Sequence, residues 1–169
     1  GDTLDIHGGG IDLVFPHREN EIAQSEGCTG KHYVNYWMHN NMLEFGNQKM
    51  SKSLGNVRTG RSFLEQYNGE ILKYMMLSAH YRSTIDFSED QVHRAIQGLA
   101  RFYSAMALAK CNMDRGGSLA PVPDQFQKLL DEQSDKIKQA MDDDFNTPEV
   151  FAALFEVTRE FNKQARRPG

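Results

Sequence analysis

The sequence predicts an α/β segment followed by an all-helical segment, and three observations support this fold class. Leu4–His7 is typical of a short strand and runs into three glycines, Gly8–Gly10. Tyr33–Phe45 is rich in aromatic and β-preferring residues. From Arg61 onward the apolar residues recur at helical spacing.

Within the α/β segment, the three glycines predict a tight turn with positive φ, where backbone N–H groups can approach a ligand closely. Residues 17–27 are expected to form a helix that Gly27 ends. Residues 33–45, interrupted by Asn40-Asn41, predict two strands or one strand and a turn. Residues 46–56 are rich in glycine, serine and lysine and are expected to form a mobile loop.

In the helical segment, Ser88 followed by Gln91 is typical of a capping box at a helix start. Thr147-Pro148-Glu149 combines an N-cap residue, a proline at the first helical position and an acid at the positive end of the helix dipole. The glycines and prolines of 114–123 predict a linker. The expected helices span 61–67, 70–80, 88–113, 124–141 and 147–163.

Composition narrows the class of protein. The 169 residues are 39% hydrophobic, which is enough for a real core, and no stretch approaches the roughly 20 apolar residues that span a bilayer. The first residues lack the features of a signal peptide, and Cys28 and Cys111 do not suggest a disulfide framework, so we expect a cytoplasmic protein without membrane partners. A net charge of −4 argues against general nucleic-acid binding.

The most specific motif is the basic segment Lys49-Met50-Ser51-Lys52-Ser53. Lysine is a mobile cation with three donors, and serine hydroxyls add further donors, so such a loop can close over a triphosphate. Taken alone, two lysines at this spacing would more often mark an exposed polar loop. Here Leu54-Gly55-Asn56 follows directly.

The string KMSKSLGN resembles the second signature of the class I aminoacyl-tRNA synthetases, and HGGGIDLVFPH resembles the cysteine-specific branch of that family. The segments HYRS, DFS and DDDFNTP extend the resemblance over nearly the whole chain. It implies the C-terminal part of a Rossmann-like catalytic domain followed by a helical bundle. On this basis 1–60 is the second half of the catalytic domain with its nucleotide turn and lysine loop, 61–113 the stem-contact and first long helices, 114–123 a linker, and 124–169 further helices.

The same resemblance implies a zinc site that binds the thiolate of the substrate cysteine through two cysteines, a histidine and a glutamate. His17 and Glu21 match the last two, and their i,i+4 spacing places both side chains on one face of a helix. Without the resemblance, a surface pair would be the better interpretation. The two cysteine ligands are expected upstream of Gly1, and neither Cys28 nor Cys111 matches them. Arg18 stands where a second histidine is usual in the family.

The resemblance further implies that Gly8, Gly9, Gly10 and Asp12 form the adenosine platform, with Lys49, Met50, Ser51, Lys52 and Ser53 on the phosphates of ATP. The alternative for Asp12 is the cap of a turn, and His7 is either a substrate-cleft contact or a core histidine. Trp37 and His39 are expected to be core or rim residues. The acidic run 142–144 is interpreted as a solvated cap and turn.

The implied activity is that of a ligase that activates L-cysteine with ATP and magnesium and transfers it to tRNA(Cys), with Lys52 as the main catalytic residue and Lys49 assisting. The chain lacks an initiator Met, so we expect a fragment that does not aminoacylate alone, from a monomeric parent with one zinc. The rival interpretations are a cysteine ligase with an amino-sugar acceptor and a noncatalytic domain that binds nucleotide or RNA.

Overall fold

The computed structural model describes residues 2–45, 48–49, 59–114 and 122–165, which form two compact units. The first unit consists of Gly1–Val57 with Tyr81–Phe87, and the second of Arg58–His80 with Ser88–Gly169. All described strands belong to the first unit, whereas the described elements of the second are helices. The predicted succession of an α/β part and an all-helical part is therefore confirmed. The finer domain limits stay predictions.

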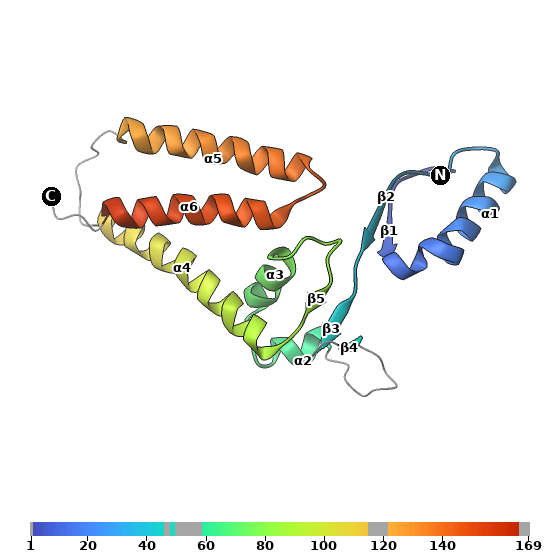
Figure 1. Ribbon diagram of the computed structural model, residues 1–169, viewed down its shortest axis with the longest axis horizontal. Helices are drawn as coiled ribbons and strands as arrows, with labels where there is room; N and C mark the ends of the chain where they lie inside the picture. The colour runs from blue at the N-terminus through green and yellow to red at the C-terminus, as the bar shows by residue number, and fades with distance from the viewer. Residues whose placement is uncertain (1, 46–47, 50–58, 115–121, 166–169) are drawn as a thin grey trace. The chain divides into compact units, whose positions relative to one another are not determined.

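The first unit is built on two parallel strands, β1 (Leu4–Gly10) and β2 (Val34–Asn40), joined through helix α1 (Glu19–Thr29) (Figure 1). Parallel strands need such a crossover, because a short turn cannot bring the chain back to the start of the next strand. His7 pairs with Trp37 in the register. This places the two rings side by side on one face of the sheet.

The three glycines do not form the predicted turn. β1 continues through Gly8–Gly10, which pair with Met38, His39 and Asn40, and among the described residues Gly30 is the glycine with positive φ. The prediction was wrong because ladder pairing with β2 decides the backbone conformation here. The absence of a Cβ atom instead lets another side chain approach the strand closely. A Cβ on Gly9 would overlap the Arg18 guanidinium.

The chain passes from β1 to α1 through a 3-10 turn, Ile11–Leu13, and a π-helical turn, Val14–Arg18. The helix predicted over 17–27 is therefore shifted by two residues. Gly27 lies inside α1, and Gly30 ends it with φ 65°, donating its N–H to the Glu26 carbonyl at 2.8 Å. A left-handed C-cap favours glycine, which explains why Gly30 ends the helix.

A second small sheet lies in the same unit. β3 (Leu43–Phe45) pairs antiparallel with β4 (Gln48–Lys49) and parallel with β5 (Ile85–Asp86). For 33–45 the prediction was two strands or one strand and a turn, and β2 and β3 confirm the first alternative. The loop predicted over 46–56 was wrong at Gln48–Lys49, whose backbone pairs with β3, and its other residues lie outside the described ones.

The second unit has five described helices, close to the predicted positions (Figure 1). The side chain of Thr59 accepts the N–H of Ser62, and that of Ser88 accepts the N–H of Gln91 at 3.4 Å, as expected for N-caps. No described helix has the length and apolar character needed to cross a membrane. The helices are α2 (Gly60–Leu64), α3 (Gly69–Leu77), α4 (Glu89–Asp114), α5 (Asp124–Asp142) and α6 (Thr147–Ala165).

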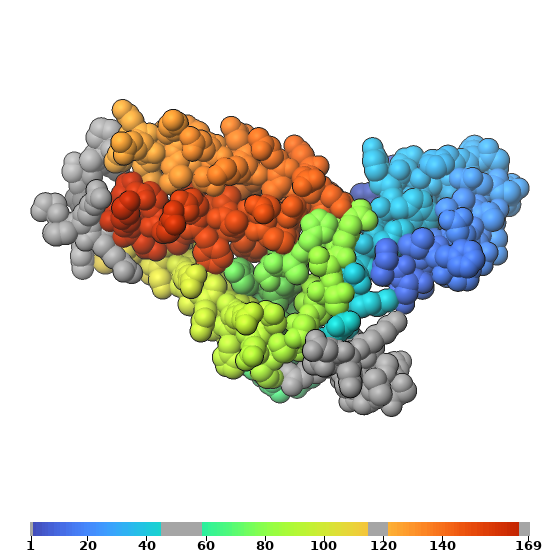
Figure 2. All heavy atoms as spheres, viewed as in Figure 1, coloured from blue at the N-terminus to red at the C-terminus, as the bar shows by residue number. Residues whose placement is uncertain are grey.

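Aromatic rings form the core where α3, α4 and α6 meet. The Tyr74 ring lies 4.8 Å from that of Phe151, and the Phe102 ring stacks on Phe155 at 4.5 Å between centroids. α5 and α6 pack side by side along their length (Figure 2), with the small residues Ala140 and Ala153 buried. Small side chains at these positions let the two helices approach closely.

The acidic run 142–144 ends α5 and forms part of the turn into α6, as predicted. Asp144 and Phe145 adopt φ 54° and 56°, a left-handed conformation that is unusual for residues other than glycine. The Asp144 carboxylate lies 3.9 Å from His80 Nε2. Residues of two sequence motifs, HYRS and DDDFNTP, are thereby brought together within the second unit.

Candidate active site

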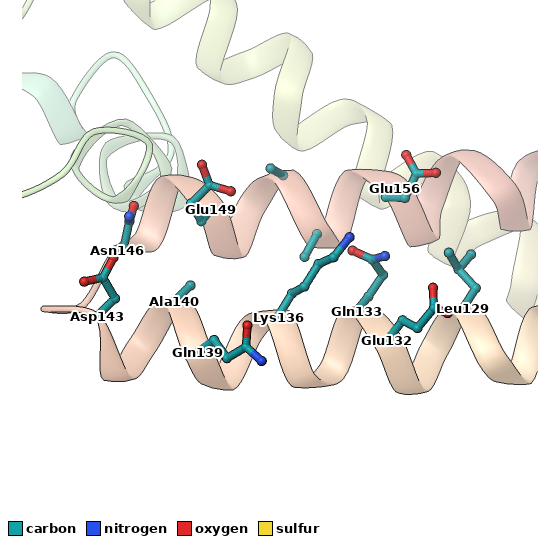
Figure 3. Close-up of a pocket in the computed structure, with 12 residues that line it drawn as sticks. Leu129, Glu132, Gln133, Lys136, Gln139, Ala140, Asp143, Asn146, Glu149 and Glu156 are labelled. Carbon is teal, nitrogen blue, oxygen red and sulfur yellow. The ribbon is translucent and has the colours of Figure 1, made fainter.

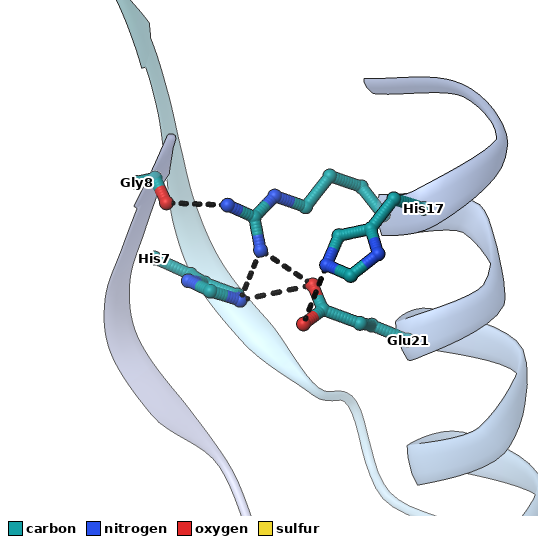
Figure 4. Close-up of polar contacts among 5 residues, drawn as sticks. His7, Gly8, His17 and Glu21 are labelled. Carbon is teal, nitrogen blue, oxygen red and sulfur yellow. Dashed lines mark hydrogen bonds and ion pairs between the residues drawn. The ribbon is translucent and has the colours of Figure 1, made fainter. Parts of the chain in front are cut away.

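Polar side chains from β1 and from the π-helical turn before α1 converge on the Glu21 carboxylate (Figure 4). Arg18 Nη1 donates to Glu21 Oε2 at 2.6 Å, and Arg18 Nη2 donates to the Gly8 carbonyl at 2.7 Å. His7 Nε2 lies 2.9 Å from Arg18 Nη1 and 3.0 Å from Glu21 Oε2. The cluster therefore ties the first strand to the helix that follows it.

Arg18 is the buried member of this cluster, with a relative exposure of 7%. Its guanidinium lies over the Trp37 ring, 5.8 Å from the centroid, and Trp37 also lies 4.9 Å from the His7 ring. Arg18 Nε has no hydrogen-bond partner among the described residues. A charge held this far from water needs a counter-charge, which Glu21 provides.

The Arg18 guanidinium, by its hydrogen bond, is the largest cause that lowers the pKa of the Glu21 carboxyl below its usual range. Partial burial opposes this shift, while the contact with His7 adds to it. Glu21 is thus held as a carboxylate. The ionised form is the one in which a glutamate binds zinc, and both of its oxygens then accept hydrogen bonds.

The contacts of His7 Nε2 with Arg18 and Glu21 depend on the position of the ring proton. Arginine only donates, so His7 accepts this bond at Nε2 when its ring proton is on Nδ1. In the other tautomer Nε2 carries the proton and donates to the Glu21 carboxylate.

His17 and Glu21 meet, as their spacing predicted: His17 Nε2 lies 3.5 Å from Glu21 Oε1. Two ligands at about 2.0–2.2 Å from a tetrahedral zinc are separated by about 3.4 Å, so this pair fits two corners of such a site. The His17 side chain is 57% exposed, which leaves the pair accessible to an ion. The described residues hold no group of three or more potential ligands, so a complete site needs ligands from elsewhere.

The other predicted residues are placed only in part. Asp12 lies in the 3-10 turn after β1, and its carboxylate occupies the space beside Gly10 that a Cβ would need. Lys49 belongs to β4, where its backbone pairs with Glu44. Residues 50–53 lie outside the described residues. Cys28 and Cys111 are exposed, in agreement with a surface role.

Sequence reasoning gave too little weight to Arg18 and to its neighbours on β2. At position 18 the only signal in the sequence was that an arginine stands where the resemblance predicted a histidine. Trp37 and His39 stack at 5.8 Å with nearly parallel rings, and His39 Nε2 is buried without a partner among the described residues. An aromatic-rich strand could indicate these packing contacts, but it could not indicate that His7 and Arg18 share them.

A groove of about 660 Å³ lies between α5 and α6 in the second unit (Figure 3). Its charged lining consists of four acids and one cation, Lys136, and the side chain of Gln133 at its base is buried. A mainly acidic groove repels phosphates, so it suits neither ATP nor an RNA backbone. The four acids are Glu132, Asp143, Glu149 and Glu156.

Comparison with known proteins identifies two family matches. Residues 1–97, more than half of the chain, match the family described as tRNA synthetases class I (C) catalytic domain. Residues 136–168 match the DALR domain. The two matches fall on the two ends of the chain, in the order expected for a catalytic segment followed by a helical one.

Among curated proteins, the chain is 58% identical to the cysteine–tRNA ligase of Bdellovibrio bacteriovorus, over 99% of this chain and 34% of that protein. It is 49% identical to the cysteine–tRNA ligase of Azotobacter vinelandii, over 96% of this chain and 32% of that protein. The chain thus spans about a third of the length of these relatives.

Two solved structures share the fold. The LeuRS in the ternary complex of Agrobacterium radiobacter K84 agnB2 LeuRS-tRNA-LeuAMS matches with a TM-score of 0.73 and 18% identity, over 95% of this chain and 23% of that one. A putative arginyl tRNA synthetase from Campylobacter jejuni matches with a TM-score of 0.65 and 14% identity, over 98% of this chain and 39% of that one. At these identities the likeness concerns the fold alone.

Proposed function

Because the chain belongs to the class I (C) tRNA synthetases, we propose that the complete protein is a cysteine–tRNA ligase. The observation that carries this proposal is the 58% identity to a protein of that name along 99% of the chain. In the proposed reaction the cysteine carboxylate attacks the α-phosphate of ATP, giving cysteinyl-adenylate and pyrophosphate. The cysteinyl group then passes to the terminal ribose of tRNA(Cys), and AMP leaves.

The proposed catalytic work is charge stabilisation and positioning. Lys52 neutralises the charge that develops on the phosphates, and Lys49 assists, because an ammonium group adds donors without requiring a covalent step. Met50, Ser51 and Ser53 complete the loop over the phosphates of ATP. The ATP is bound together with magnesium. Gly8, Gly9, Gly10 and Asp12 are proposed to face the adenosine. The position of Asp12 supports this, since its carboxylate lies beside Gly10 at the end of β1.

We propose that His17 Nε2 and Glu21 Oε1 hold a zinc ion together with two cysteines from another part of the complete protein. Their separation of 3.5 Å supports this assignment. When bound, zinc supplies a soft Lewis acid that prefers a thiolate to a hydroxyl, which separates cysteine from serine. Arg18 keeps the Glu21 carboxylate ionised, and the exposed ring of His17 leaves the ion accessible to a substrate.

We further propose that the complete enzyme is a cytoplasmic monomer and that its helical part contacts the tRNA. Residues 136–168 match the DALR domain and lie outside the match to the catalytic domain, which supports a role for this part of the second unit apart from the chemical step. The second unit carries basic side chains at its exposed helix surfaces, for example Arg94 and Lys110.

The test is aminoacylation of total tRNA by the full-length protein, with cysteine and with serine, and again with Lys52→Ala. We expect charging with cysteine alone, and a loss of the adenylation rate of at least about 100-fold in the variant, the scale seen when one charge-stabilising donor is removed. Consumption of ATP and cysteine without charged tRNA would replace this proposal by the amino-sugar ligase. If neither substrate is consumed, the protein is instead a noncatalytic binding domain.

A further inference from the structure

Arg18 is fixed on three sides in a way that a surface arginine is not. Its two terminal nitrogens bond Glu21 Oε2, His7 Nε2 and the Gly8 carbonyl at distances between 2.6 and 2.9 Å. Only 9% of its side chain is exposed. Because the guanidinium is planar and its donors are rigidly arranged, these contacts together determine its position and orientation.

The fixed position of Arg18 gives the two carboxylate oxygens of Glu21 different surroundings. Arg18 and His7 occupy the surroundings of Oε2, whereas Oε1 faces His17 Nε2 at 3.5 Å. A glutamate side chain has three rotatable bonds and would otherwise sample many rotamers. By bonding Oε2, Arg18 therefore restricts the Glu21 rotamer and leaves Oε1 for another partner, and the two oxygens are drawn with their contacts in Figure 4.

β1 has a feature that matches this arginine. A Cβ built on Gly9 would overlap Arg18 Nη2, with the Cζ carbon only 3.1 Å away. Gly8, one residue earlier, has the Met38 carbonyl as its nearest neighbour at 3.4 Å, which is close to an ordinary contact. The strand thus leaves room for the guanidinium at one position, because successive residues of a strand face opposite sides.

We propose that Arg18 is a positioning residue that holds Glu21 by one carboxylate oxygen, so that Glu21 offers a metal a single oxygen beside His17. This rests on the proposed function in taking His17 and Glu21 as metal ligands. A carboxylate held in this way favours a four-coordinate ion such as zinc. A carboxylate that binds through both oxygens suits larger cations such as calcium, which take six to eight ligands.

The test uses the full-length protein and measures zinc affinity by competition with a chelator. Arg18→Met keeps the length of the side chain but removes its donors, and we expect zinc binding to weaken by about 10- to 100-fold, the usual effect of losing a contact that orients a metal ligand. Arg18→Lys keeps the charge, but one ammonium group cannot reach both Glu21 and the Gly8 carbonyl in the same way. We expect an intermediate loss.

A matched pair of glycine variants separates positioning from a general loss of fold. Gly9→Ala retains Arg18, Glu21 and His17 but displaces the guanidinium, so zinc affinity should fall at least about 10-fold. Gly27→Ala in α1 should leave zinc affinity within about twofold, since its Cβ meets nothing within 4 Å. Melting of each zinc-free variant reports whether it is folded.

Cobalt in place of zinc gives a readout that a purely structural role would not move. The visible absorption of protein-bound cobalt reports its coordination number, and we expect a four-coordinate spectrum in the wild type and a changed one in Arg18→Met and Gly9→Ala. Unchanged affinity and spectrum in both folded variants would overturn the role of Arg18 and leave the proposed function standing. Wild-type protein that binds no zinc, or binds it equally well as Glu21→Gln, would overturn both the metal site and this role, whereas charging of tRNA would still test the ligase separately. Glu19→Gln, an exposed acid in the same helix turn, is the control for removing a carboxylate.

Discussion

Gly98 in α4 faces the Tyr74 ring, and replacing it with alanine should destabilise the second unit. A Cβ at this position would lie only 2.7 Å from Tyr74 Cζ and 2.9 Å from Cε1, and closer still to the hydroxyl oxygen. Alanine is favoured over glycine in a helix by about 1 kcal/mol. Overpacking a core costs about 1–3 kcal/mol, and Tyr74 cannot swing away easily because it packs against Phe102 and Phe151. The net effect expected is a destabilisation of about 0–2 kcal/mol.

Gly27→Ala in α1 is the matched control. It is also a helical glycine, but its side-chain position meets nothing within 4 Å. Only the propensity term applies there, so α1 should gain about 1 kcal/mol. Native-state hydrogen exchange of the amides in α4 and α1 measures both changes in the same protein.

A second mutation tests whether Tyr74 is the cause. In a Tyr74→Phe background the nearest atom, the hydroxyl oxygen, is removed, while the ring carbons remain. Gly98→Ala should then cost less than in the wild type, with a coupling of about 0.5–3 kcal/mol, as is usual for residues in direct contact. If Gly98→Ala stabilises α4 as Gly27→Ala stabilises α1, the steric reasoning is refuted.

Three further predictions concern the second unit. Thr59→Ala removes the cap of α2 and Asn68→Ala that of α3, and each should cost about 0.5–2 kcal/mol in chemical denaturation, whereas serine at either position should restore most of the loss. Burial raises the pKa of the Tyr74 hydroxyl in the folded state. The contribution of this neutral hydroxyl to folding stability is therefore fully present below the unfolded pKa of about 10, and it is lost as the pH rises through the higher folded pKa. Tyr74→Phe should flatten this alkaline loss of stability in pH-dependent unfolding; an identical pH profile would show that other groups cause it.

The long helices were predictable because their signals are local. Apolar spacing and the capping signals at Ser88 and Thr147 identified α4 and α6 within two residues at each end, although Thr147 is the first residue of α6 and not its N-cap. The C-terminal end of α1 was not predictable, because Gly27 and Gly30 are equally good candidates for its C-cap. Only the backbone shows that Gly30 adopts positive φ. Similarly, three glycines after a strand fit both a turn and a continued strand. Pairing with β2, a partner 30 residues along the chain, decides between them.

The metal-ligand candidates of the site were predictable from the sequence. The contacts that fix their orientation were not. The spacing of His17 and Glu21 identified the pair, although His17 lies in the π-helical turn before α1 rather than in the helix. The approach of Arg18 to Gly8 and His7 depends on how β1 lies against that turn, which no local pattern encodes.

This difference has a physical reason. Metal-ligating side chains carry chemistry that can be recognised from residue type and spacing, because the ion itself imposes the arrangement of its ligands. The residues that orient them need only a donor of the right reach, and in this chain an arginine supplies it at a position where the resemblance predicted a histidine. The space for the longer side chain comes from Gly9, which lies on a different element and whose missing Cβ the guanidinium replaces. Arg18 and Gly9 are therefore expected to depend on each other, and a histidine at position 18 should make the protein more tolerant of alanine at position 9.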